Sequence, residues 1–158
     1  RNEVNLRLGV KRLILEASTS EVDLNIATSS SHANVDTLLS VNLGTNWQEY
    51  FSIIETSNTT KKKKPDPAVY KNVLKKTGLN PENVIAIEDT TNGLKAASGA
   101  GIKAVITVHR LTANHSFDGA SLVLDSMGEP DQAFKVLSGK AFNSSYLDIA
   151  LLEKLLET

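Results

Sequence analysis

The sequence contains no cysteine, which excludes disulfide bonds, thiolate nucleophiles and cysteine-ligated metals. Aromatic residues make up only 5% of the chain, and no apolar run approaches the length of a membrane span. The formal net charge is −1, so there is no electrostatic basis for binding nucleic acid or an anionic membrane. What remains is an ordinary globular composition, 41% apolar and 22% charged, in 158 residues, enough for one domain with a hydrophobic core.

Histidine is scarce as well. The three histidines, His32, His109 and His115, are not spaced as metal ligands, and we expect a surface or structural role for each. The compartment and the oligomeric state stay open, with a soluble, cytoplasmic or plastid-like protein as the expectation. The chain begins with arginine rather than methionine, and we interpret it as part of a longer protein.

Short apolar runs alternate along the chain with segments of helical periodicity. Helices are expected over 9–17, over the segment that follows the serines at 29–31 and ends before Gly44, and over 68–77, 92–100 and 147–156. Strands are expected over 22–28, 52–55, 84–88, 103–108 and 121–124, and 119–140 is the least regular stretch. Alternating apolar strands and helices are typical of an α/β fold with a parallel sheet covered by helices on both faces.

One strand ends in two adjacent carboxylates. The stretch "VIAIEDTTNGLKAA" places Glu88 and Asp89 directly after an apolar run, and hydroxyl side chains then precede a helical pattern. Ligands of open α/β sheets bind at the carboxyl ends of the strands. Two carboxylates there form a site for a hard divalent cation, with Mg²⁺ as the expected ion.

Two further groups are predicted at the same edge of the sheet. Thr28 and Ser29 end an earlier strand and precede a helix, where a hydroxyl and backbone N–H groups suit a phosphate oxygen. Lys64 lies in the loop between the two strand ends and would balance charge around a phosphoryl group. A metal, an anion cradle and a cation on one edge together predict phosphoryl transfer.

Each feature also has a plainer interpretation. A Glu–Asp pair after a strand often caps the next helix, "TSSS" is an ordinary capping sequence, and the run 61–64 is an ordinary solvated loop. The lysines at 61–63 are expected to be solvated. The functional interpretation depends on the combination and its order along the chain.

The combination resembles the haloacid dehalogenase (HAD) superfamily of phosphohydrolases, in the branch that holds phosphoglycolate phosphatases and β-phosphoglucomutases. The stretch "LNIATSSS", which includes Thr28, is similar to the second family motif. The stretch "KKPDPAVYKNVLKKTGL", which includes Lys64, is similar to the third motif. The stretch "VIAIEDTTNGLKAASGAGIKAV", which includes Glu88 and Asp89, is similar to the fourth motif. The match runs from about residue 8 to residue 130. The stretches "GVKRLILEA", "ATSSSHANVDTLL" and "GASLVLDSMGEP" resemble most the subgroup that acts on xylulose 1,5-bisphosphate.

The resemblance implies a three-layer Rossmann-like core in which Asp89 and Glu88 hold Mg²⁺. Thr28, Ser29 and Lys64 would bind phosphate, with Thr28 and Lys64 as catalytic residues, and a small phosphorylated sugar would be the substrate. The family reacts through an aspartyl-phosphate formed on a D-x-D motif of its central strand. None of the eight aspartates here is followed by another two residues later.

The resemblance therefore implies that residues 1–158 are the C-terminal part of a HAD core, without the first strand and the helical cap. We expect this chain alone not to turn over, and its sheet to show a gap or a repair with bare strand edges. A phosphomutase of the β-phosphoglucomutase type and a non-catalytic HAD-like binding module are the alternatives.

Overall fold

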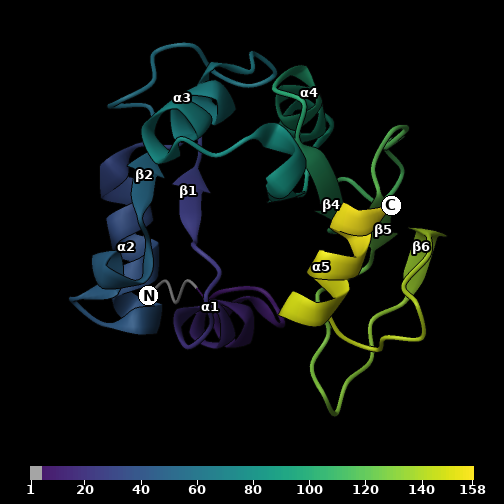
Figure 1. Ribbon diagram of the computed structural model, residues 1–158. Helices are drawn as coiled ribbons and strands as arrows, with labels where there is room; N and C mark the ends of the chain where they lie inside the picture. Colours follow the sequence, from purple (N-terminus) through teal and green to yellow (C-terminus); the bar gives the residue numbers. More distant parts are fainter. Residues whose placement is uncertain (1–4) are drawn as a thin grey trace.

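The computed structural model describes residues 5–158 (Figure 1). Its α-helices are α1 (Val10–Ser18), α2 (His32–Leu43), α3 (Ala68–Thr77), α4 (Thr91–Gly99) and α5 (Ile149–Glu157). Two short 3₁₀ helices are η1 (Trp47–Tyr50) and η2 (Pro81–Asn83). The strands are β1 (Asn25–Ala27), β2 (Ile53–Glu55), β3 (Ile85–Glu88), β4 (Lys103–Thr107), β5 (Leu122–Leu124) and β6 (Val136–Gly139).

The strands form two separate sheets within the described residues. The first sheet pairs β1 with β2 in parallel, and the second has the order β3-β4-β5-β6. In the second sheet β3, β4 and β5 are parallel, whereas β6 runs antiparallel to β5. Figure 1 shows the two sheets apart, with α3 above the β1–β2 pair and α1 below β1. The expected α/β fold is confirmed, and the expected gap in its sheet is present.

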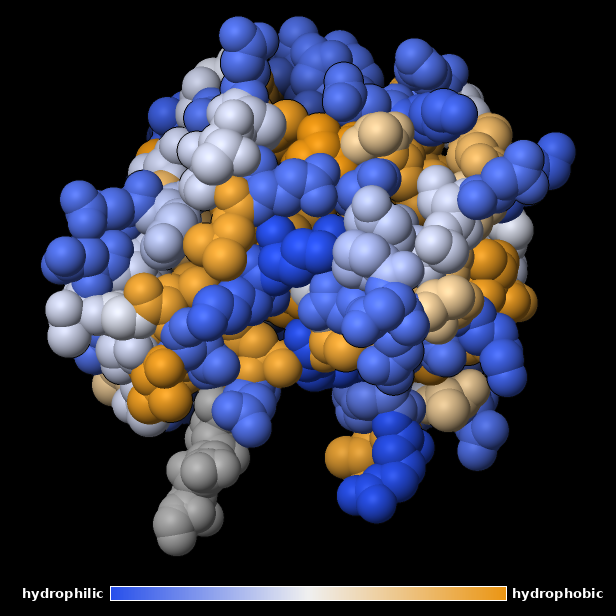
Figure 2. All heavy atoms as spheres, turned by 90° about the horizontal axis from the view of Figure 1, so that it is seen from below, coloured by the Kyte–Doolittle hydropathy of each residue, from blue (hydrophilic) through white to orange (hydrophobic). Residues whose placement is uncertain are grey.

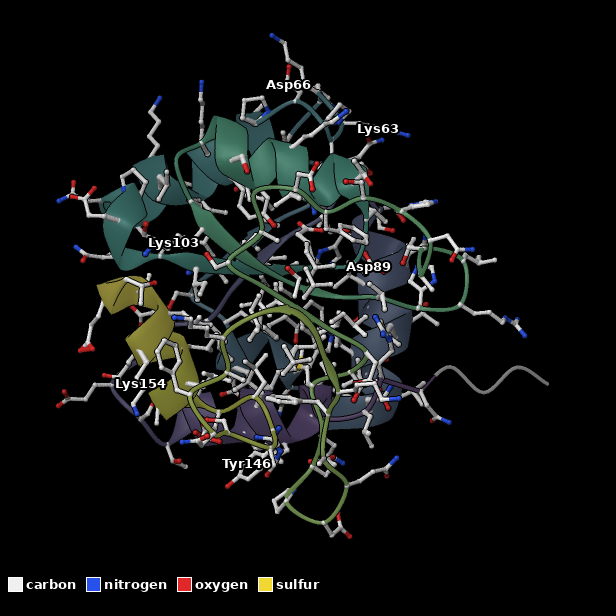
Figure 3. The ribbon with its side chains drawn as sticks, turned by 90° about the vertical axis from the view of Figure 1, so that its right-hand side faces the viewer. Lys63, Asp66, Asp89, Lys103, Tyr146 and Lys154 are labelled. Atoms are coloured by element: carbon white, nitrogen blue, oxygen red, sulfur yellow. The ribbon has the colours of Figure 1, made fainter. Side chains whose placement is uncertain are left out.

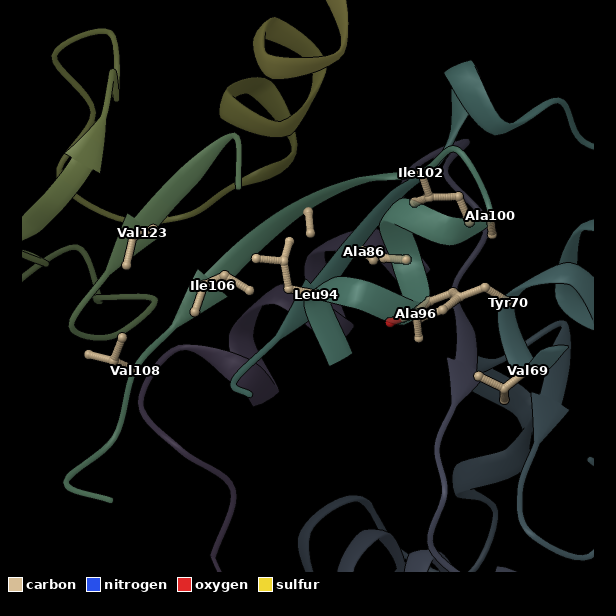
Figure 4. Packing of buried hydrophobic residues seen from close by; sticks show 12 residues of the cluster. Val69, Tyr70, Ala86, Leu94, Ala96, Ala100, Ile102, Ile106, Val108 and Val123 are labelled. Carbon is tan, nitrogen blue, oxygen red and sulfur yellow. The ribbon is translucent and has the colours of Figure 1, made fainter. Parts of the chain in front are cut away.

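Helices cover both faces of the larger sheet, so its side chains alternate between two hydrophobic clusters. Ala104 and Ile106 of β4 pack with Ala86 and Leu94 on the α3–α4 side (Figure 4). Val105 packs in the other direction, with residues of α1 and α5. A third cluster joins α2 and η1 to the β1–β2 pair around the fully buried Trp47. The result is the expected helix–sheet–helix layering.

The helix ends follow the capping residues that the sequence offers. The Ser31 hydroxyl accepts from Asn34 N at the start of α2, and the Thr90 hydroxyl accepts from Gly93 N at the start of α4. Gly78 ends α3 in the left-handed conformation, which glycine adopts without a steric penalty. The hydroxyls after Glu88 and Asp89 therefore start the helix, as their position predicts.

The strand β6 was not predicted, because 119–140 has no apolar alternation. All four residues of β6 are exposed, including Val136 and Leu137, and within residues 5–158 the strand pairs only with β5. A strand of this kind is specified by pairing with a neighbour rather than by its own burial pattern. The face seen from below carries separate apolar patches among polar side chains (Figure 2). No helix among residues 5–158 has the length and apolar character to span a bilayer.

Glu55 at the end of β2 is fully buried in a network of donors. Its carboxylate accepts from Thr59 and Thr60 hydroxyls at 3.1 and 2.7 Å and from Lys76 Nζ at 2.5 Å. Burial acts to raise the pKa of Glu55, but the hydrogen bonds from Lys76, Thr60 and Thr59 outweigh it, so the pKa lies below its ordinary 4.5.

We predict that Glu55→Gln lowers the free energy of unfolding by about 2 kcal/mol at neutral pH. In glutamine an NH₂ group replaces one of the buried carboxylate oxygens, so a hydrogen-bond donor faces the donors that this oxygen accepted from. The Lys76 side chain is half exposed, so the loss of unfolding free energy stays below that expected for a fully buried ion pair. Because the folded pKa is depressed, the difference from wild type should be complete above about pH 4.5 and shrink as the pH falls below it. Urea unfolding across pH measures it, and the exposed Glu49→Gln is the control. A pH-independent difference would contradict the prediction.

Candidate functional site

The carboxyl ends of β1, β3 and β4 meet on one side of the molecule. Figure 3 shows Asp89, which follows β3, on the same side as Lys63, while Lys103 at the start of β4 lies on the opposite side. Parallel strands bring the residues that follow them to a common edge. The predicted site residues Thr28, Lys64, Glu88 and Asp89 all belong to this edge or to the loop that returns to it.

Lys64 links the two sheets. Its ammonium donates to the carbonyl oxygen of Ala27, the last residue of β1, at 2.8 Å, and to Glu88 Oε2, at the end of β3, at 2.6 Å. Its backbone N–H donates to Ser29 Oγ at 3.1 Å, and the peptide bond that follows, to Pro65, is cis. Only 14% of the Lys64 side chain is exposed. The lysine therefore differs from the exposed Lys61, Lys62 and Lys63, which are solvated as expected.

Glu88 is held in place from three directions. Its Oε2 accepts from Lys64 Nζ and also from the Tyr70 hydroxyl, which is buried on α3. Burial and the neighbouring charge of Glu88 raise the pKa of Tyr70 well above 10, so the phenol keeps its proton and acts as a donor. Gly93 lies against the other oxygen, where a Cβ atom would be 2.0 Å from Glu88 Oε1. The carboxylate is therefore buried, paired and sterically confined.

Asp89 has a different environment, although it is the next residue. Its side chain is 47% exposed, and its Oδ2 lies 3.5 Å from His109 Nε2. His109 follows β4, and β4 pairs with β3 so that Glu88 is opposite Ile106. Asp89 thus presents an accessible carboxylate at the edge of the sheet, beside the imidazole of His109.

Thr28 and Ser29 form the turn between β1 and α2. The Thr28 hydroxyl accepts from Ser30 N at 3.0 Å, which shapes the turn, and Thr28 N–H donates to Glu55 O at 3.0 Å. Ser29 is partly buried and is joined to the Lys64 loop through its hydroxyl. The structure therefore brings the predicted phosphate-binding residues next to Lys64.

The donor set fits a magnesium ion in its chemistry. Mg²⁺ prefers oxygen ligands and is bound in proteins by one or two carboxylates together with water and substrate phosphate. Asp89 is open for such binding, whereas one oxygen of Glu88 is already engaged by Lys64 and Tyr70. Within residues 5–158 no cluster of three or more acidic or histidine side chains could hold a metal by itself. Asp89 is therefore the principal candidate ligand, with Glu88 beside it, and the described residues supply no third acidic or histidine ligand.

Two neighbours of the site were not predicted as site residues. Tyr70 belongs to the apolar face of α3 by its spacing, and nothing in the local pattern points to its hydroxyl. His109 could have been found, because a residue that follows one parallel strand lies beside the residue that follows the next strand. The order of β3 and β4 along the chain was the available signal.

Comparison with known proteins assigns a family to this arrangement. The model of the haloacid dehalogenase-like hydrolase family matches residues 1–107. The CbbY protein of Cupriavidus necator is 46% identical over 125 residues, which cover 79% of this chain and 49% of that protein. The chain spans about half the length of the curated relatives it matches first.

Solved structures show the same similarity. A mutant CbbY from Rhodobacter sphaeroides in complex with xylulose-(1,5)bisphosphate is 36% identical, with a TM-score of 0.76, over 80% of this chain and 56% of that one. A putative β-phosphoglucomutase from Thermotoga maritima is 28% identical, with a TM-score of 0.64, over 73% of this chain and 53% of that one.

Proposed function

The chain belongs to the haloacid dehalogenase-like hydrolase family, and from this premise we propose that it forms the phosphate- and metal-binding half of a Mg²⁺-dependent phosphatase of small sugar phosphates. The observation that carries the proposal is the bridge that Lys64 makes between the ends of β1 and β3, next to the accessible carboxylate of Asp89. The similarity to a CbbY structure in complex with xylulose-(1,5)bisphosphate supports a sugar bisphosphate as the substrate.

The environment of each site residue indicates the role that it would have in binding the phosphoryl group or the metal. Thr28 and Ser29 would receive phosphoryl oxygens through a hydroxyl and backbone N–H groups at the start of α2. Lys64 would neutralise charge on the phosphoryl group, because its ammonium is already held at the edge by Ala27 and Glu88. Asp89, with Glu88 beside it, would hold Mg²⁺, which when bound neutralises phosphate charge.

The nucleophile would come from polypeptide outside these 158 residues. No D-x-D occurs in the sequence, and the family forms its aspartyl-phosphate on such a motif. This chain alone would therefore bind phosphate weakly and not turn over. Transfer to a second sugar hydroxyl instead of water, as in a phosphomutase, is the second candidate, favoured by the similarity to the putative β-phosphoglucomutase.

We predict that the protein encoded when this reading frame is extended upstream releases phosphate from xylulose 1,5-bisphosphate, and that chelation of Mg²⁺ abolishes the release. Asp89→Asn in that protein should weaken activation by Mg²⁺ about 10- to 100-fold, because a ligand charge is lost. The exposed Asp131→Asn is the matched control and should leave activation unchanged. Phosphate release with and without EDTA measures both effects.

Three outcomes separate the candidates. Free phosphate as the main product supports the phosphatase, while a rearranged sugar phosphate without net phosphate release supports the mutase. Metal-independent turnover, or an Asp89→Asn protein with wild-type activation, would overturn the proposed metal site.

A further inference from the structure

The charges of the chain are distributed unevenly, although they nearly cancel. Residues 61–76 contain seven of the seventeen cationic side chains and only one of the eighteen acidic ones, Asp66. The rest of the chain therefore carries seventeen acidic against ten cationic side chains. The net charge of −1 thus conceals a strongly basic segment in an otherwise acidic chain, and a local excess of one sign attracts ions of the other sign from solution.

The basic segment lies beside the candidate site. It comprises the loop that leads to Lys64 and the helix α3, and the Lys64 ammonium reaches the ends of both β1 and β3. Figure 3 shows Lys63 on the same side as Asp89. α3 begins at Ala68 with no acidic residue in its first turn, so the positive end of its dipole also lies near this edge and is not neutralised there.

Most of the lysines in the segment are not paired with a carboxylate. Lys64 and Lys76 form ion pairs with Glu88 and Glu55. The acid of the segment, Asp66, accepts through Oδ1 from Ala68 N at 2.9 Å and so caps the start of α3. Five lysines are exposed and form no ion pair within residues 5–158: Lys61, Lys62, Lys63, Lys71 and Lys75. The first three, which we call the lysine loop, directly precede Lys64 in the chain.

We propose that the lysine loop draws doubly phosphorylated substrates to the candidate site, and that it thereby makes the protein prefer a sugar bisphosphate over the corresponding monophosphates. The inference rests on the proposed phosphatase function and adds a determinant of its substrate class. Thr28, Ser29 and Lys64 receive the reacting phosphate, while the second phosphate lies in the field of the lysine loop. A second phosphate about doubles the charge on which that field acts, so the attraction is larger for the bisphosphate.

The test compares two triple variants of the longer protein described under the proposed function. One variant neutralises the lysine loop by Lys61→Gln, Lys62→Gln and Lys63→Gln. The control variant removes the same amount of charge at exposed positions outside the basic segment, by Lys11→Gln, Lys135→Gln and Lys140→Gln. At about 0.1 M ionic strength the Debye length is about 10 Å, so nearby charges act on the substrate and distant ones are screened.

The substrates are xylulose 1,5-bisphosphate and its two monophosphates, xylulose 1-phosphate and xylulose 5-phosphate. In the loop variant, kcat/KM for the bisphosphate should fall about tenfold, kcat/KM for each monophosphate about threefold, and kcat should not change. In 1 M salt, where the Debye length is about 3 Å, these differences should disappear. The control variant should stay within about twofold of wild type for all three substrates.

Three results would overturn the proposal. An equal fall in kcat/KM for bisphosphate and monophosphates would show that the loop does not distinguish substrates by charge. A fall in kcat alone, or a difference that persists in 1 M salt, would show that the loop acts on the chemical step or on the fold.

The outcomes also separate this proposal from the proposed function. Turnover that the loop variant leaves unchanged refutes the role of the loop and leaves the phosphatase standing. If no substrate is turned over, the phosphatase fails, and calorimetric binding of xylulose 1,5-bisphosphate then tests the loop alone. Binding about tenfold weaker in the loop variant at 0.1 M ionic strength would support the loop's role, and equal binding would refute it.

Discussion

Replacing Lys64 with methionine is expected to lower the free energy of unfolding by about 3–5 kcal/mol. Only 7% of the Glu88 side chain is exposed, and Lys64 is its sole cationic partner within the described residues. Removing one partner of a buried ion pair leaves the other charge without water or counter-charge, which is the costly case. Methionine keeps the apolar stem, so the loss reports the ammonium rather than packing.

Chemical denaturation of Lys64→Met beside Lys63→Met measures the effect of the bridge. Lys63 is the neighbouring exposed lysine, and its change should stay within about 0.5 kcal/mol. Adding Glu88→Gln to Lys64→Met should recover a large part of the loss, because no buried charge then remains. Amide exchange at the end of β1 should also rise in Lys64→Met, since Ala27 O loses its donor. Equal losses of unfolding free energy in Lys64→Met and Lys63→Met would refute the buried bridge.

Replacing Gly93 with alanine is expected to lower the free energy of unfolding by about 3 kcal/mol, although the helix propensity of alanine exceeds that of glycine by about 1 kcal/mol. The added Cβ would lie 2.0 Å from Glu88 Oε1 and 2.4 Å from its Cδ, closer than real Cβ atoms approach. Glu88 cannot move freely, because Lys64 and Tyr70 both hold its other oxygen. The methyl group would therefore disrupt the bridge between the sheets.

A double-mutant cycle with Glu88→Ala isolates this clash. In the Glu88→Ala background, Gly93→Ala should be neutral or slightly stabilising, because the obstructing carboxylate is gone. Asn92→Ala, an exposed change in the same helical turn, is the control and should stay within about 0.5 kcal/mol. A cost that persists without the Glu88 side chain would show that the glycine is required for another reason.

Local patterns predicted much of the fold. The apolar run before Glu88 and Asp89, the hydroxyl cap after them and the periodicity of α3 all depend on residues within about one or two helical turns. The position of Lys64, Thr28, Glu88 and Asp89 at one edge followed from the order of parallel strands. The roles of these residues stay predictions that the proposed assays test.

The parts that the sequence did not predict depend on distant partners. The exposed strand β6 forms because it pairs with the edge of β5. Its own residues show no alternation of buried and exposed side chains that would predict this pairing. Tyr70 has the spacing of a core residue, and its hydroxyl becomes a site group only because Glu88, 18 residues further on, lies opposite it. His109 reaches Asp89 only through the register of β4 against β3.

The sequence by itself determined the element types apart from β6, the family resemblance and the set of polar residues at the strand ends, because capping, periodicity and strand order are local or sequential properties. Only the tertiary structure decided how the environments of the adjacent residues Glu88 and Asp89 differ. Glu88 became a buried partner of Lys64 and Tyr70, while Asp89 stayed half exposed. Successive residues at a strand end point to opposite sides of the sheet, and the surroundings of each side are set by helices far away in the chain.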